Sequence, residues 1–469
     1  MKISRFLAVI VLSWHSLQAE SISFFAPRSV TTNSAFELAL VNYDRYHSSN
    51  DQDDAWVQFY WKPFFMKSNN GNCLARYFLP HNKACVSLDE SGAGDIDPLW
   101  FSLISPDGTF YTSTVCLCPT RKAYGALFDL YINVADCWWL GLTTTAMKVE
   151  HNLHVRELDR KYEGTIPGFQ NACEAFNNPL WNAGKLPCSK RCQSGVDDVQ
   201  LKLGYDFYTT DESHATLYVV GTVPTGKHVT SSVLFEPLVG SRHGSFGVGL
   251  DVDYAVCGCD EYAFNLLGDL KYRYVFSAQE RRSFDLTQNG DWSRYLLVVT
   301  EAEPLDSMPA INLLTLKSEV TPGSTVDFWL AAHYARCNWH LEVGYDVWWR
   351  QAEKICLGSC GIAPGYGIQT LNVCPEGATT ASTANISQSV RGPNGVVNDP
   401  SFVPLTTQDL NLCSAAHPAA HSQTVYGAVA YDASLCGYHM MVGGGASYEF
   451  DAHNALRQWT VWFAQGFEF

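Results

Sequence analysis

The chain has 469 residues with 31 Lys and Arg against 47 Asp and Glu, which gives a formal net charge of −16. An acidic surface repels phosphates, so this balance excludes general nucleic-acid binding. Beyond residue 20, charges, Gly and Pro interrupt every apolar run before it reaches the ~20 residues of a membrane helix. If the chain spans a membrane, only a closed β-barrel remains, because lipid offers backbone groups no hydrogen-bond partners.

The N-terminus has the pattern of an export signal. Lys2 and Arg5 precede an apolar run over residues 6–14, and Leu17-Gln18-Ala19 form the end of the leader. We expect residues 1–19 to be a cleaved secretory signal peptide that takes no part in the fold. A retained signal anchor is the alternative, but its apolar run is far below the ~20 residues that span a bilayer. No Cys follows the cut, so a lipid anchor is not indicated.

Residues 20–54 precede the first clear strand and show only a brief alternation at Phe36, Leu38 and Leu40. They are expected to form a periplasmic extension, a plug in a barrel lumen or an early strand. The chain from 55 to 469 carries a long strand pattern and is expected to form one β-barrel.

Strict two-residue alternation over unusually long segments is the strongest signal. Over residues 244–258, Phe246 and Val248 share one face while Asp251 and Asp253 share the other. Residues 260–277 repeat the pattern, with charges between large apolar residues. Residues two apart do not share a helical face, so these segments are strands. Soluble strands are usually about five or six residues long, whereas a tilted membrane strand needs ~9–11.

Fourteen segments carry this pattern, which predicts an all-β fold, a transmembrane antiparallel β-barrel of about 14 strands (12–16) with long disulfide-containing loops. The segments lie near residues 55–66, 109–118, 122–135, 138–156, 197–209, 213–223, 244–258, 260–277, 291–303, 324–336, 338–351, 423–432, 436–450 and 455–469. Long loops are expected near 67–108, 157–196 and 352–422. With both termini periplasmic, alternation of strand direction places the 157–196 loop on the periplasmic side. Either a strand is miscounted or that segment folds inward as a plug.

Sixteen cysteines, an even number, lie mostly between the strand segments. A chain exported to an oxidising compartment is expected to pair them as disulfides that hold the loops, within the chain or between chains, and spacing does not reveal the connectivity. Cys413, His417 and His421, with Cys356 and Cys360, have the spacing of soft-metal ligands. Disulfides are favoured there, and we expect neither a metal nor a cofactor.

The chain ends in Gly466-Phe467-Glu468-Phe469. In the segment before it, every second residue counted back from the final Phe is mostly apolar. This ending resembles the terminal strand of bacterial outer-membrane β-barrel proteins, where a closing Phe with an aromatic residue two positions earlier serves as the assembly signal. The resemblance implies a bacterial outer-membrane location, membrane lipid and the barrel-assembly machinery as partners, and Phe467 and Phe469 as the insertion signal. The chain departs from the usual pattern at Trp462 and Ala464.

The resemblance identifies an architecture rather than a subfamily. Porin-like and fatty-acid-transporter-like barrels both fit the strand number, and passive transport is what such barrels most often perform. A cysteine-rich barrel is also similar to the major outer-membrane proteins of some intracellular bacteria, whose envelopes are disulfide-linked.

Alternation divides the strand residues into a lipid-facing set and a lumen-facing set. Charges in the lumen would set selectivity, or they would form a salt-bridged interior with no role in transport. The candidate pore-lining residues are Lys202, Asp251, Asp253, Asp269, Lys271, Arg273, His333, Glu342, Asp346 and Arg350. Tryptophans suit the aromatic belt at the membrane interface. The candidates are Trp138, Trp139, Trp348, Trp349, Trp459 and Trp462.

We therefore expect an outer-membrane pore or channel for the passive passage of small solutes, with a homo-oligomer or intermolecular disulfides as further possibilities. No nucleophile elbow, phosphate-binding glycine loop or zinc-protease motif is present, so we expect no enzyme and no catalytic residue. One alternative is a plugged structural or adhesive outer-membrane barrel. The other is a secreted, disulfide-rich, soluble β-sandwich binding protein, whose strands would be shorter than these.

Overall fold

The structure is a computed structural model that describes residues 21–47, 57–103, 111–135, 137–161, 168–210, 213–259, 261–303, 306–359, 361–369, 384–388, 402–435 and 438–469. The expected signal peptide, residues 1–19, lies outside the described residues. None of the described helices is long and apolar enough to cross a membrane.

Twelve strands of 10 to 16 residues close into one antiparallel ring. They are β1 (Val57–Ser68), β4 (Thr120–Ala135), β5 (Trp138–Asn152), β8 (Val199–Thr209), β9 (His214–Val223), β10 (Ser245–Cys259), β11 (Tyr262–Val275), β17 (Gly323–Arg336), β18 (Trp339–Arg350), β22 (Ala420–Leu435), β23 (Tyr438–His453) and β24 (Gln458–Glu468). The last strand closes the ring on the first, with Phe59 opposite Phe467. Another strand, β7 (Arg191–Val196), pairs with β5 outside the ring, beside the point where β8 begins. The predicted transmembrane β-barrel is confirmed, with a strand number inside the expected range.

Two of the fourteen segments predicted as strands belong to the loops. The segment near 109–118 holds β3 (Thr112–Cys116), which pairs with β2 (Cys85–Asp89), and the segment near 291–303 holds β14 (Leu297–Thr300), which pairs with β20 (Tyr366–Ile368). Removing the first of them from the barrel count reverses the expected side of the 157–196 loop. The conflict in strand direction therefore came from a miscounted strand.

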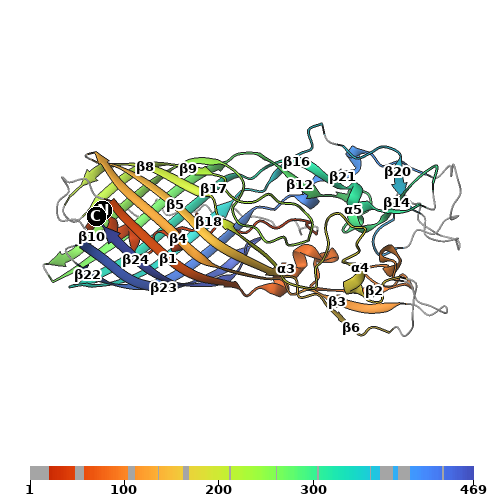
Figure 1. The fold of residues 1–469 in the computed structure, drawn as a ribbon, viewed down its shortest axis with the longest axis horizontal. Helices are drawn as coiled ribbons and strands as arrows, with labels where there is room; N and C mark the ends of the chain where they lie inside the picture. The colour runs from red at the N-terminus through yellow and green to blue at the C-terminus, as the bar shows by residue number, and fades with distance from the viewer. Residues whose placement is uncertain are drawn as a thin grey trace, which may run out of the picture.

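Short turns gather at one end of the barrel and long loops at the other (Figure 1). At the first end, successive strands are separated by only two to four residues, at 136–137, 210–213, 260–261, 337–338 and 436–437. The long connections span residues 69–119, 153–198, 224–244, 276–322 and 351–419. They are called here the turn end and the loop end, and the arrangement is the one expected of an outer-membrane barrel.

The long loops fold together into a second body beyond the loop end (Figure 1). Its large apolar core includes Phe78, Trp100, Phe101, Trp292 and Tyr295. Disulfides join Cys85 to Cys116 and Cys173 to Cys188. The other elements of this body are α3 (Gly71–Phe78), η1 (Pro80–Asn82), η2 (Pro98–Phe101), β6 (Arg156–Leu158), α4 (Ala172–Ala175), β12 (Ala278–Ser283), β13 (Asp285–Leu286), η3 (Ser293–Tyr295), β15 (Met308–Pro309), α5 (Ala310–Leu313), β16 (Thr315–Thr321), β19 (Lys354–Cys356), η5 (Thr407–Asp409), β21 (Leu410–Asn411) and η6 (Leu412–Ala415).

The apolar side of the strand alternation faces outward. Leu217, Tyr254 and Val343 are more than half exposed, and comparable Leu, Val, Tyr and Phe side chains lie on the outside of strands around the ring. Their polar neighbours in the alternation point into the barrel and are buried. A soluble β-sandwich buries its apolar face against a second sheet, so this alternative is wrong.

A charge on this outer face tests the membrane contact. Leu266 lies near the middle of β11 with its side chain outward. Leu266→Lys is expected to destabilise the barrel folded in lipid vesicles by about 2–4 kcal/mol, because the ammonium would lie near the bilayer midplane. Leu180→Lys, at an exposed loop position, is the control and should fold like the wild type. Equal folding yields for the two variants across a denaturant series would contradict a lipid-facing Leu266.

The N-terminal segment, residues 21–47, begins in the loop body, where Ile22 and Phe25 join the apolar core, and then runs through the inside of the ring. It holds two short helices, α1 (Ser34–Glu37) and α2 (Val41–His47). Phe36, Leu38 and Val41 pack with inward aromatic rings of the wall, including Tyr131 and Trp462. The brief alternation seen in the sequence here is therefore not an early barrel strand.

Candidate functional site

The site is the interior of the barrel, where charged side chains of the wall meet the N-terminal segment. All ten candidate pore-lining residues are buried on the inner side of their strands. They divide into a middle group (Lys202, Asp269, Lys271 and Glu342), a loop-end group (Arg273, Asp346 and Arg350) and a turn-end group (Asp251, Asp253 and His333). What the sequence did not reveal is that most of their partners come from residues 28–47.

Glu37 forms the central contact. Its carboxylate pairs with Lys202 on β8 and, at 3.1 Å, with Lys271 on β11. Gln200 donates a further hydrogen bond of 2.7 Å. All of these side chains are almost completely shielded from solvent. Two lysines of the wall thus share one carboxylate of the N-terminal segment, in a place where unpaired charges would be costly.

Lys62 on β1 holds the same part of the segment through its backbone. Its ammonium donates to the carbonyl oxygens of Phe36, Glu37 and Ala39 at 2.8–3.0 Å. Two carbonyls of the last turn of the short helix α1 and one just after it therefore have a partner supplied by the wall, which fixes the path of the chain toward α2.

Towards the loop end the segment is held by Arg28. Its guanidinium contacts Asp346 at 2.6 Å and Asp327 at 2.5 Å, and Asp327 also pairs with Arg273 at 2.7 Å. Thr31 hydrogen bonds through its hydroxyl to Thr145 on β5 at 2.9 Å. Strands on opposite parts of the ring are thereby bridged by one short stretch of chain.

At the turn end, α2 is held by carboxylates of β10. Asn42 and Arg45 both contact Asp251 at 3.1 Å, and His47 lies 2.7 Å from Asp253. Ion pairs at both ends and in the middle therefore tie the N-terminal segment to the wall.

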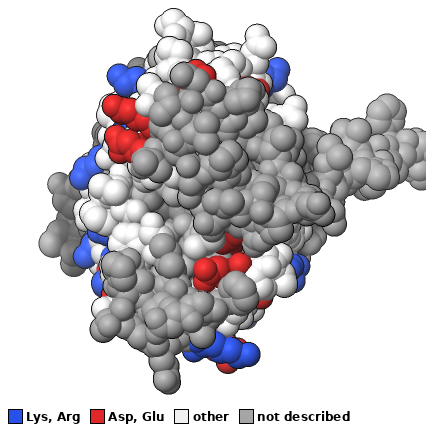
Figure 2. Space-filling model, turned by 90° about the vertical axis from the view of Figure 1, so that its right-hand side faces the viewer, with Lys and Arg blue, Asp and Glu red and all other residues white. Residues whose placement is uncertain are grey.

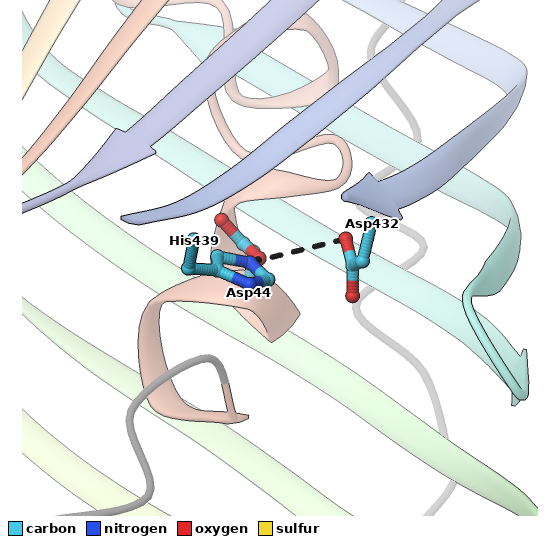
Figure 3. Close-up of side chains that lie close together, drawn as sticks. All are labelled: Asp44, Asp432 and His439. Carbon is cyan, nitrogen blue, oxygen red and sulfur yellow. Dashed lines mark hydrogen bonds and ion pairs between the residues drawn. The ribbon is translucent and has the colours of Figure 1, made fainter. Parts of the chain in front are cut away.

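A cluster of ligating side chains joins α2 to the last hairpin (Figure 3). Asp44 on α2 lies 3.3 Å from His439 on β23, and His439 lies 3.9 Å from Asp432 on β22. The three ligand atoms lie within 4.8 Å of one another. Carboxylate oxygen and imidazole nitrogen are common Zn²⁺ ligands, so within the described residues this group has the composition and spacing to hold a divalent cation.

Histidines extend this cluster along the inner wall. His340 bonds to Asp432 at 2.6 Å and to His333 at 3.1 Å, and His333 bonds in turn to Glu342 at 3.0 Å. Tyr43 of α2 stacks on His333 with ring centroids 3.8 Å apart. The chain of imidazoles and carboxylates therefore runs from the turn end to the barrel middle beside α2.

A closed ring of long strands that is apolar outside and charged inside fits only a membrane, because in water the outer face would expose a continuous apolar band. The chain is an outer-membrane β-barrel protein. No protein-family model matches it, and no curated protein matches it in sequence.

Solved structures of other barrels are similar to it at low levels. An outer membrane channel from Pseudomonas putida F1 matches at 10% identity and a TM-score of 0.36, covering 90% of this chain and 99% of that one. The CymD monoaromatic hydrocarbon channel matches at 10% identity and 0.30, covering 97% and 98%. A Pseudomonas aeruginosa FadL homologue matches at 9% identity and 0.26, covering 88% of each chain. At these values the matches say nothing about the solute of this outer-membrane barrel.

The six candidate interface tryptophans divide between the two faces of the barrel. Trp138 is exposed, and Trp349 and Trp459 are partly exposed on the outer side. Trp139, Trp348 and Trp462 are buried inside, so their interpretation as interface residues needs correction. Adjacent strand residues point to opposite faces, which makes it impossible for both members of a Trp pair such as 138–139 to face lipid.

The inward tryptophans contact the N-terminal segment instead. Trp139 and Trp348 lie under the guanidinium groups of Arg45 and Arg28, at 4.6 Å and 5.5 Å from ring centroid to Cζ. Trp462 packs edge-on against Phe36. Phe467 and Phe469, the expected insertion signal, lie outward on β24 and at its end, with ring centroids 6.3 Å apart.

A cavity of about 100 Å³, measured as the space open to the centre of a water molecule, lies at the loop end of the lumen. It is bounded by the N-terminal segment at Phe24–Ser29, by the loop-end parts of several strands and by the loop 224–244. Five arginines line it: Arg28, Arg121, Arg273, Arg282 and Arg350.

Three charged groups of the loop body beside the cavity pair with one another. Arg282 contacts Glu280 at 2.7 Å and Glu353 at 3.1 Å. Burial would raise the pKa of Glu280, but Arg282 and His243 outweigh it and lower the pKa to about 2. Glu280 is therefore ionised at neutral pH, and the charge of Arg282 is paired with the carboxylates of Glu280 and Glu353.

Sequence reasoning missed Arg28, Glu37, Asp44 and Lys62. The first three lie in residues 20–54, where no long alternation marks an inner face. Lys62 is one of the alternate residues of β1 that face inward, so the alternation of β1 could have identified it as a lumen residue. A dense row of inward charges on the strands was the remaining hint that something polar fills the lumen.

Proposed function

We propose that this protein is a channel for the passive passage of small solutes across the outer membrane, and not an enzyme, with residues 21–47 acting as a plug. The observation that carries the proposal is the kind of contact between segment and wall. Buried ion pairs add little stability over apolar packing, because desolvation offsets their attraction. A wall that meets water after the segment withdraws can rehydrate these charges, whereas an apolar wall could not.

Conductance of the refolded, oxidised protein in planar lipid bilayers tests this function. We expect discrete current steps with long closed periods, because the plug contacts must break before ions pass. Folding is checked in parallel by a heat-modifiable band on gels. A correctly folded protein that never gives a step would contradict the channel.

A plugged structural or adhesive barrel is the second candidate. Its support is the body formed by the loops, which has its own apolar core and two disulfides at the end away from the turns. Such a body presents a stable surface outside the cell. Folded protein without conductance, together with binding of the loop end to a host or neighbouring surface, would favour this function over transport.

Exposed thiols at the turn end support a proposal on assembly. Cys137, Cys257, Cys259 and Cys337 are exposed there and carry no disulfide in the structure. We expect oxidation by dissolved oxygen to link copies of the chain into a ladder of oligomers on non-reducing gels. Replacing these four by Ser should remove the ladder, while Cys73→Ser and Cys192→Ser at the loop end should leave it. A ladder that survives the fourfold change would place the links elsewhere.

A further inference from the structure

Two of the five arginines that line the loop-end cavity have no acidic partner. Arg28, Arg273 and Arg282 pair with carboxylates, as described above. Arg121 and Arg350 are 2% and 7% exposed, and within the part of the chain that the structure describes neither forms an ion pair. The Nε atom of Arg121 and the Nε and Nη2 atoms of Arg350 are buried without a hydrogen-bond partner. A buried, unpaired guanidinium is costly, so these groups are poised to bind an anion.

Hydroxyl groups on the same cavity wall add further donors. Thr325 lies directly opposite Arg350 in the pairing of β17 with β18, and Thr222 lies at the end of β9. Both residues line the cavity, and both hydroxyl oxygens are buried without a partner. The guanidinium of Arg350 and the hydroxyl of Thr325, side by side on neighbouring strands, match the two oxygens of a carboxylate.

The rest of the lining is largely apolar. Phe24, Val229, Leu238 and Trp348 surround the space, and the ring of Trp348 lies 5.9 Å from Cζ of Arg350. Of the acidic groups that also line the cavity, Glu280 and Glu353 pair with Arg282, and Oδ2 of Asp198 accepts from the backbone N–H of Ser241. A strongly hydrated inorganic ion would leave most of its oxygens against apolar surface.

We propose that this cavity binds a small organic anion, a carboxylate with a short apolar body, through Arg350 and Thr325. A cavity of about 150 Å³ can hold benzene, so the space of about 100 Å³ here suits a body of a few carbons. The inference names the solute class of the channel and rests on that proposed function. The site lies at the loop end of the lumen, where the N-terminal segment itself forms part of the cavity wall.

Calorimetric titration of the full, refolded chain in detergent with butyrate tests the site. We expect butyrate to bind and butanamide, its uncharged counterpart of similar shape, to bind far more weakly. Arg350→Gln should weaken butyrate at least about tenfold, because a hydrogen bond to a charged group contributes ~1.5–3 kcal/mol. Arg281→Gln, at an exposed position on β12 next to the cavity residue Arg282, is the matched control and should bind like the wild type.

Thr325→Val is a second variant that tests the site even if Arg350→Gln fails to fold. Removing a buried hydroxyl that has no partner should not destabilise the barrel, yet it should weaken butyrate severalfold. Equal binding of butyrate and butanamide, stronger binding of inorganic phosphate, or no effect of either substitution would overturn the proposal. Conductance is measured separately. Butyrate binding without current steps would support this site and contradict the channel function. Current steps without butyrate binding would support the channel and contradict this site.

Discussion

Deleting residues 21–47 is expected to turn a mostly closed barrel into an open pore. The twelve strands keep all of their pairing without the segment, because ring closure depends on β1 and β24 and not on the interior. The wall charges released from Glu37 and Arg28 become hydrated in a water-filled lumen. We expect the time-averaged current per inserted protein to rise at least about tenfold, because no segment is left to occupy the lumen and hold it closed.

The control for this deletion is a test that the shortened protein still folds into a barrel. The shortened protein should still show a heat-modifiable band and the β-sheet signal of the full chain in circular dichroism. A folded deletion variant with the same current as the full chain would show that the N-terminal segment does not close the lumen.

Glu37→Gln is expected to have the largest effect of any single substitution in the segment. The change removes the ion-pair partner that Lys202 and Lys271 share, while both ammonium groups stay buried as long as the segment stays in place. Breaking a buried pair from one side costs about 3–5 kcal/mol, which shifts the ratio of closed to open barrels roughly a hundredfold or more. Single-channel recording should show this as a large rise in open probability at unchanged step size.

An unchanged size of the single-channel current step would show that the open barrel itself is intact, so that only the opening of the lumen has changed. Glu301→Gln, at an exposed position in a loop, is the matched control and should gate like the wild type. If Glu37→Gln lowers the folding yield and leaves the open probability as it was, Glu37 stabilises the barrel and takes no part in a gate.

The sequence predicted the barrel because a lipid-facing wall imposes a two-residue period over ten or more residues, and few other folds sustain it. The inward charges of the strands followed from the same period. The loops were less predictable: β3 and β14 have strand-like composition, but they pair within the loop body, and alternation alone does not say which sheet a strand joins. Tertiary packing decides that question.

The partners inside the barrel could not be found from the pattern. Glu37 and Arg28 belong to a segment of short helices and irregular chain, which has no period of its own. Only the three-dimensional path brings them against strands more than 150 residues away in the chain. The inward tryptophans are a different case, because composition suggested an interface role but the alternation along the strand would have assigned Trp139 to the lumen.

A reversible lock on the N-terminal segment tests the central claim most directly. The hydroxyl oxygens of Thr31 and Thr145 lie 2.9 Å apart, so the pair Thr31→Cys and Thr145→Cys places two thiols where a disulfide can form between segment and wall. Single-channel recording should show no steps after oxidation and a return of steps after reduction, while Thr31→Cys alone and the wild type conduct alike under both conditions. Steps that persist with the cross-link fully formed would contradict a lumen closed by residues 21–47.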